Sequence, residues 1–288
     1  MDRLSHAGFN DPMTAQTDSP VLVIGGTGKT GRRVAARLRE RGVAVRIGSR
    51  SGSPPFEWKD RATWAPAVHG ASAAYVAYSP DLAVPGAAEA IADFARVALD
   101  GGTRRLVLIS GRGEAEAQRA EQELQASGAD WTIVRCSWFS QNFSEDHLRD
   151  AVQAGEVVLP VDDVPEPFVD VDDIADVAVA ALTDDRHIGR LYELTGPRLL
   201  TFEDALGEIG AATGRDIRLT RVSEHDYAAA LAGHGVPHGV ISLLSYLLTV
   251  VLDGRNASVA DGVQRALGRP ARDFRDYALR AAAAGAWS

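Results

Sequence analysis

Three glycines at regular spacing follow the first apolar run of the chain, in Val21-Leu-Val-Ile-Gly-Gly-Thr-Gly-Lys-Thr-Gly31. Gly25 permits a tight turn after a strand, Gly28 lets the backbone approach a pyrophosphate, and Gly31 lets the next helix pack closely on the strand. The N–H groups and dipole at the start of that helix favour phosphate charge. The sequence therefore predicts a dinucleotide-binding turn. Its side chains are expected to add further cofactor contacts, from Thr27, Lys29 and Thr30.

The end of the second predicted strand indicates which dinucleotide is bound. NAD enzymes place an acid about 20 residues after the glycines, where NADP enzymes place an arginine for the 2′-phosphate. No acid occurs between Glu40 and Glu57, but Arg50 and Ser51 stand there. We therefore expect NADP(H) as cofactor, with Arg50 and Ser51 on the 2′-phosphate and Lys29 as a second cation.

The residues from Lys29 to Arg50 form a basic segment in an acidic protein. They include eight basic residues and one acid, whereas the whole chain of 288 residues has a net charge of −9. Arg33, Arg37 and Arg41 fit a solvated face of the predicted helix. The negative net charge argues against a nucleic-acid partner, which would need a basic surface.

Apolar runs alternate with helix-like segments along the first two thirds of the chain, as is typical of βαβ units in an α/β fold. Strands are predicted at 20–24, 43–48, 73–77, 105–110, 131–134 and 190–194. Helices are predicted at 28–41, 84–100, 114–127, 138–154 and 169–182. Right-handed crossovers between parallel strands then give a Rossmann-type, doubly wound parallel sheet with helices on both faces.

The pattern also predicts how the chain is divided. We expect residues 1–18 to be a flexible tail, in which Met13 is an alternative start to Met1. Residues 19–195 are predicted to form the dinucleotide-binding domain, with a substrate-cleft insertion at about 138–168. Residues 196–288 are expected to form a smaller substrate region with helices only. Its apolar run 240–252 is shorter than the ~20 residues of a membrane span, and we expect a buried helix or a pocket wall.

Cysteine, histidine and acidic residues give little sign of other chemistry. The single cysteine, Cys136, cannot form an internal disulfide, which favours a reducing cytoplasm. The chain lacks the clustered cysteines and histidines of a structural zinc site, and no metal is expected. Asp170, Asp172 and Asp173 precede a predicted helix, where they are expected to cap it and complement its dipole.

Beyond the tail, nearly the whole chain resembles the NmrA-like group of atypical short-chain dehydrogenase/reductases. Within that group it is most similar to bacterial relatives of the ergot-alkaloid reductases, the agroclavine dehydrogenase and festuclavine synthase set. The resemblance implies a Rossmann core that binds NADP, a C-terminal substrate region and hydride transfer in the cleft between them. The segments that carry it are the glycine turn, 56–60 with Thr63-Trp64, 75–80, 127–135, 138–143 and 167–175.

The proton donor usual in that superfamily is absent. Typical members use Tyr-x-x-x-Lys, whose lysine lowers the tyrosine pKa. Here the only lysines are Lys29 and Lys59, and neither follows a tyrosine by four residues. Ser110, Tyr78 and His147 remain as candidate catalytic residues. An iminium or a quinone accepts hydride without a strong protein acid, so either substrate fits.

Two classes of function follow from these observations. The first is an NADPH-dependent reductase of a hydrophobic cyclic or aromatic molecule, such as an imine or iminium, a quinone or a ketone. The second is a non-catalytic NADP(H) sensor that binds protein partners, since the NmrA-like group contains both kinds. A reductase needs an apolar ligand pocket, whose walls we expect from Trp138, Phe139, Phe143 and Tyr246. Ala77 and Ser110, at strand ends, are expected beside the cofactor. A homodimer is left open, and neither a membrane nor a nucleic acid is expected as a partner.

Overall fold

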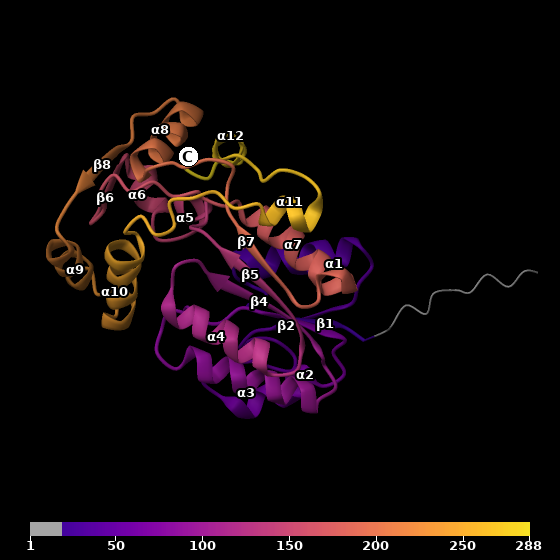
Figure 1. Cartoon of the computed structure of the whole chain (residues 1–288). Coiled ribbons are helices and arrows are strands. Elements are labelled where there is room, and N and C mark those ends of the chain that lie inside the picture. Colours follow the sequence, from indigo (N-terminus) through magenta and orange to yellow (C-terminus); the bar gives the residue numbers. More distant parts are fainter. Residues whose placement is uncertain (1–18) are drawn as a thin grey trace, which may run out of the picture.

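The computed structural model describes residues 19–288, and the predicted tail with Met13 lies outside them. Its centre is a six-stranded parallel sheet of order β2-β1-β3-β4-β5-β7 (Figure 1). All six strands lie where the apolar runs predicted them, within a few residues. They are β1 (Val21–Ile24), β2 (Val45–Gly48), β3 (Ala73–Val76), β4 (Arg105–Gly111), β5 (Asp130–Cys136) and β7 (Arg190–Leu194).

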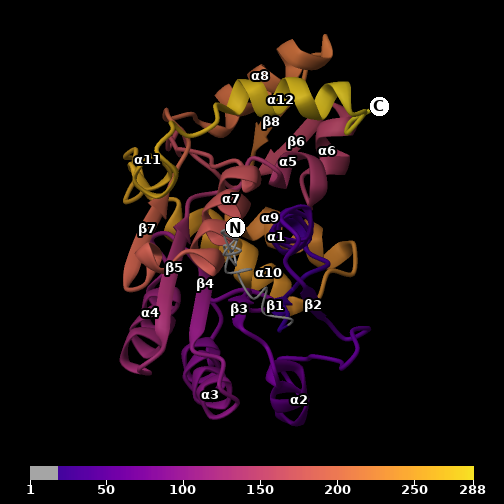
Figure 2. The same cartoon turned by 90° about the vertical axis from the view of Figure 1, so that its right-hand side faces the viewer.

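Helices cover both faces of this sheet, as Figure 2 shows. Alternate residues of β1 point to opposite faces: Val21 and Val23 pack with the first set of helices, and Leu22 and Ile24 with the second. The first set contains α1 (Lys29–Glu40), α7 (Val171–Thr183) and α11 (Gly262–Leu267). The second contains α2 (Trp64–Val68), α3 (Ala87–Asp100) and α4 (Ala115–Ala126). The fold is therefore the predicted doubly wound, Rossmann-type sheet.

The arginines of α1 correct one prediction. Arg33 and Arg37 were expected on a solvated face, but both are largely buried between α1 and α7. Arg33 pairs with Glu145 at 2.7 Å and Arg37 with Asp176 at 2.7 Å. Arg41 is exposed, as predicted. The acids that follow position 140 were not considered as partners, because they are more than 100 positions away in the chain.

A third hydrophobic core lies above the carboxyl ends of the strands and joins two distant parts of the chain. Its elements are α5 (Asn142–Glu145), α6 (Arg149–Ala154), β6 (Glu156–Leu159), α8 (Phe202–Thr213), β8 (Arg218–Arg221) and α12 (Phe274–Ala283). β6 and β8 pair in parallel as a small second sheet. The region after residue 196 was predicted to hold helices only, so β8 is a correction. Its sequence, Arg-Leu-Thr-Arg, carries too little apolar pattern to indicate a strand.

The predicted helix 138–154 is broken into α5 and α6. Asp146 ends α5 in an extended conformation, because its side chain forms an ion pair with Lys29. The remaining elements are η1 (Arg61–Thr63), η2 (Asp185–His187), α9 (Glu224–Gly233), α10 (His238–Ser245) and the π-helical turn η3 (Tyr246–Val251). Within residues 19–288, no helix is both long and apolar enough to cross a membrane.

Candidate functional site

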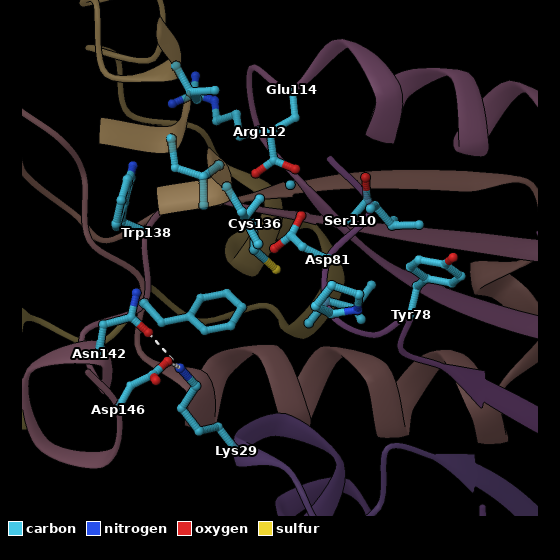
Figure 3. Close-up of a pocket in the computed structure, with 18 of the residues that line it drawn as sticks. Lys29, Tyr78, Asp81, Ser110, Arg112, Glu114, Cys136, Trp138, Asn142 and Asp146 are labelled. Carbon is cyan, nitrogen blue, oxygen red and sulfur yellow. Dashed lines mark hydrogen bonds and ion pairs between the residues drawn. The ribbon is translucent and has the colours of Figure 1, made fainter. Parts of the chain in front are cut away.

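A cavity of about 460 Å³ opens at the carboxyl ends of β3, β4 and β5 (Figure 3). It lies beside the point where the chain leaves β1, which pairs with β2 on one side and β3 on the other. In open α/β sheets, ligands bind at this edge, where the strand order reverses. One wall is formed by α10 and η3, with Val240, Leu243, Leu244, Leu247 and Val251.

The glycine turn has the geometry that a pyrophosphate needs. Gly25 has φ +69°, a conformation that favours glycine. A Cβ at Gly31 would overlap the Gly25 carbonyl, so α1 can lie this close to the turn only with glycine there. Gly28 caps α1 without a side-chain hydrogen bond, and Thr27 and Gly28 are exposed. The first N–H groups of a helix have no intrahelical partner, so this terminus fits an anionic group.

Lys29 lies on the cavity side of the turn. Its Nζ donates a hydrogen bond to Asn142 Oδ1 at 2.7 Å and pairs with Asp146. It also lies 5.6 Å from the centre of the Phe139 ring. Thr30, whose hydroxyl accepts a 2.9 Å hydrogen bond from the buried Tyr75, lines the same wall.

Arg50 and Ser51 lie elsewhere on the same edge of the sheet, in the exposed turn after β2. Within the described residues, Arg50 forms no ion pair and does not line the cavity. Because Lys29 is engaged by Asp146 and Asn142, the structure does not bring it to Arg50 as a second cation. A 2′-phosphate at the end of β2 would therefore meet Arg50 alone of these two.

The three candidate proton donors all line the cavity, in different environments. Burial raises the pKa of Tyr78, whose ring packs 4.9 Å from that of Trp58. Ser110 is 4% exposed, and its hydroxyl donates to Glu121 Oε1 at 2.7 Å, so its proton is already engaged. The His147 ring lies 3.7 Å from Asp146 at the rim.

Two of the four predicted aromatic walls line the cavity, and two do not. Trp138 and Phe139 are in its lining. Phe143 is fully buried in the third core, against Phe168. Tyr246 lies outside the lining because α10 and η3 turn a different stripe, from Val240 to Val251, toward the cavity. Ala77, the predicted cofactor contact at the end of β3, does line it.

Sequence reasoning missed two carboxyl groups in the lining, Asp81 and Glu114. Burial raises the pKa of both. Neither belongs to a motif, and 32 residues separate them in the chain; their only signal was a position just after a strand end. Cys136, also in the lining, is buried, and burial raises the pKa of its thiol, which does not act as a thiolate.

The acids before α7 have the expected structural role. The Asp170 carboxylate caps the helix by accepting the N–H of Asp172 at 2.9 Å. In residues 19–288, no group of histidine, cysteine, aspartate and glutamate side chains could hold a metal ion.

Comparison with known proteins places this geometry in a family. A family model for NAD(P)H-binding proteins matches residues 25–185. The chain is 30% identical to the uncharacterized oxidoreductase YesF of Bacillus subtilis, over 92% of this chain and 96% of that protein. It is 29% identical to the agroclavine dehydrogenase of Claviceps fusiformis, over 89% of this chain and 95% of that one.

Solved structures show the same fold. The triphenylmethane reductase of Citrobacter sp., solved with NADP(H), superposes with a TM-score of 0.72 at 17% identity, over 91% of this chain and 99% of that chain. The negative transcriptional regulator NmrA superposes with a TM-score of 0.68 at 15% identity, over 93% and 97%. The chain therefore belongs to the NAD(P)H-binding family, as an oxidoreductase of the NmrA-like group that the sequence pattern had indicated.

Proposed function

We propose that the protein is an NADPH-dependent reductase of hydrophobic cyclic or aromatic small molecules, among them imines or iminium ions, quinones and ketones. The observation that carries the proposal is the cavity beside the glycine turn, which has an apolar wall and the size of a small-molecule site. A non-catalytic sensor would need the dinucleotide site but not this wall.

The residues present fit a dinucleotide that lies across the sheet edge. Gly25, Gly28 and the start of α1 would hold the pyrophosphate, with Arg50 and Ser51 on the 2′-phosphate. Ala77 and Ser110 would lie beside the nicotinamide, which when bound supplies the hydride. Trp138, Phe139 and the leucines of α10 and η3 would hold the apolar substrate and exclude water.

The cofactor preference is tested with one arginine. We expect NADPH to bind about tenfold or more tightly than NADH, because a charge-assisted hydrogen bond to the 2′-phosphate contributes about 1.5–3 kcal/mol. Arg50→Ala should remove most of that difference. Arg41→Ala is the matched control, since Arg41 is exposed and follows the opposite end of α1. Equal affinities in the unchanged protein, measured by calorimetry, would contradict the assignment.

The reductase activity is tested by NADPH oxidation with a panel of imines, quinones and ketones. Turnover with apolar cyclic members supports the proposal. Tight NADPH binding without turnover of any member would favour the alternative, an NADP(H)-sensing regulatory protein, for which the fold likeness to NmrA speaks. We also propose a cytoplasmic location and leave open whether a homodimer forms.

A further inference from the structure

Two carboxyl groups face each other in the wall of the cavity, and the proposed reaction has not yet used them. Asp81 lies in the loop between β3 and α3, and Glu114 precedes the first residue of α4. The two are hydrogen-bonded to each other, and Figure 3 shows their side chains pointing toward one another from opposite elements. A hydrogen bond between two carboxyl groups requires that one of them keeps its proton.

The surrounding cations are occupied elsewhere. Lys29 pairs with Asp146, Arg112 donates to the Ser258 carbonyl at 2.7 Å, and Arg135 pairs with Glu121. Since two neighbouring carboxylates without a cation cannot both ionise readily, the pair holds one shared proton near neutral pH. This is the state expected of a carboxylic acid that donates a proton.

The local structure assigns the proton to Glu114. Asp81 Oδ1 accepts the N–H of Ala83 at 2.8 Å, which favours the ionised form at Asp81. Glu114 is 9% exposed, and its Oε2 has no hydrogen-bond partner anywhere in residues 19–288. A Cβ at Gly111 would overlap the Glu114 carboxyl group, so glycine there leaves the space that this buried acid occupies.

We propose that Glu114, held in its protonated form by Asp81, is the catalytic acid that delivers a proton to the substrate oxygen or nitrogen. The inference rests on the proposed reductase function. It replaces the tyrosine of the missing Tyr-x-x-x-Lys dyad by a carboxylic acid contributed from the turn between β4 and α4.

The step balances for a ketone. The reduced nicotinamide supplies a hydride, whose electron pair forms the new C–H bond while the C=O π pair moves to oxygen. The Glu114 O–H bond breaks, and its proton forms the alcohol O–H bond. The pair is left doubly ionised and takes a proton from solvent at the open side of the cavity. A tetrasubstituted iminium needs hydride alone, because the C=N π pair becomes the lone pair of a neutral amine.

The shared proton can be tested without turnover. The infrared spectrum of the whole protein at neutral pH should contain a carboxylic acid C=O band that shifts in D₂O and is lost in Glu114→Gln. Glu116→Gln is the matched control, because Glu116 lies on α4 and pairs with Arg119 outside the cavity. A band of unchanged intensity in Glu114→Gln would overturn the protonation assignment.

Proton delivery is tested by the ratio of two activities. General acid catalysis contributes about 10²- to 10⁴-fold, so Glu114→Gln should lower the ketone-to-iminium ratio of kcat by about 100-fold, and Glu116→Gln should leave it unchanged. Equal losses on both substrates would overturn the inference, because they would indicate a packing role. A wild-type protein that keeps the infrared band but reduces no substrate would contradict the proposed reductase function and, with it, proton delivery.

Asp81 is a positioning residue, and its test is a pH profile. Lys29 of α1, Glu121 of α4 and Cys136 of β5 also act on this pair. In the wild type, ketone turnover should fall as pH rises through the raised pKa of Glu114. Asp81→Asn removes the neighbouring negative charge, so the falling limb should move to lower pH. An unmoved limb would contradict the role of Asp81.

Discussion

Buried acids occur in two contrasting settings in this protein. Between α1 and α7, Glu145, Asp172 and Asp176 lie against arginine guanidinium groups. In the cavity, Asp81 and Glu114 lie against each other. Burial acts on all five in the same direction, toward the neutral acid. The arginines reverse it: hydrogen bonds and charge from Arg33 and Arg37 lower the pKa of the first three acids, against the burial that opposes them.

The difference shows that the partner, rather than the depth, decides which acids can do chemistry. A carboxylate paired with arginine is fixed in one charge state over the working pH range and joins elements together. A buried carboxyl group without a cation retains a proton that it can release. If this comparison is correct, exchanging or removing the partners should change stability on one side and proton chemistry on the other.

The largest effect is expected where a paired acid is most deeply buried. Asp173 is 0% exposed and accepts hydrogen bonds from the Arg272 backbone N–H at 2.7 Å and from Arg269 at 2.8 Å. Asp173→Asn leaves two partly buried guanidinium groups without their anion. Breaking such a pair costs about 3–5 kcal/mol, and we expect a loss of this size in the free energy of urea unfolding.

Asp261→Asn is the matched control for that measurement. Asp261 is exposed and lies 3.8 Å from Arg265 on the surface, where pairs contribute about 0–1 kcal/mol. If both variants lost the same small amount, the arginine partners would not be important for stability, and the comparison would fail on its paired side.

The next effect concerns an acid without a cation outside the cavity. Glu166 is fully buried, and its carboxylate accepts one hydrogen bond, from Ser137 at 3.1 Å. Burial raises its pKa from 4.5 to about 7. A raised pKa means that the folded protein binds this proton more tightly, so its stabilising contribution is complete below pH 4.5 and is lost as pH rises to about 7.

Each pKa unit corresponds to about 1.4 kcal/mol, so the ionisable Glu166 should account for about 3 kcal/mol of lost unfolding free energy between about pH 5 and about pH 8. Glu166→Gln should flatten this part of the curve. Glu123→Gln, an exposed position on α4, should leave the slope unchanged. An identical slope in wild type and Glu166→Gln would show that Glu166 is not the group that titrates.

The two settings differ equally in how far the sequence predicts them. Continuous apolar runs such as Leu106-Val-Leu predict strands, because a parallel strand is buried on both faces. The glycine turn is local, so its motif predicts it directly. Asp81 and Glu114 become neighbours only because β3 and β4 are adjacent in the sheet, and no short pattern contains them both.

Two errors have the same physical origin. Phe143 was expected in the pocket wall because it follows Trp138 and Phe139 closely in the chain. The turn at α5 points it instead into the third core, against rings from α8 and the α12 segment. The helix predicted across Asp146 is interrupted because Lys29, more than 100 positions earlier, binds that carboxylate. In both cases, long-range packing overrides the local pattern.

The smallest effect is expected at Ser110, which the sequence had suggested as a catalytic residue. Its hydroxyl donates to Glu121, and Glu121 also accepts a hydrogen bond from Arg135 Nε at 2.9 Å. Ser110 thus belongs to the paired setting, although it lines the cavity. Ser110→Ala removes one donor from a carboxylate that keeps its arginine, so we expect a stability loss of about 1–2 kcal/mol. Ketone turnover should fall no more than about fivefold, which is about 1 kcal/mol in the barrier. The comparison uses the same assay as Glu114→Gln, with NADPH affinity measured alongside. A loss above about a hundredfold at Ser110, the size expected for a general acid, would move the proton donor from the carboxyl pair to this hydroxyl.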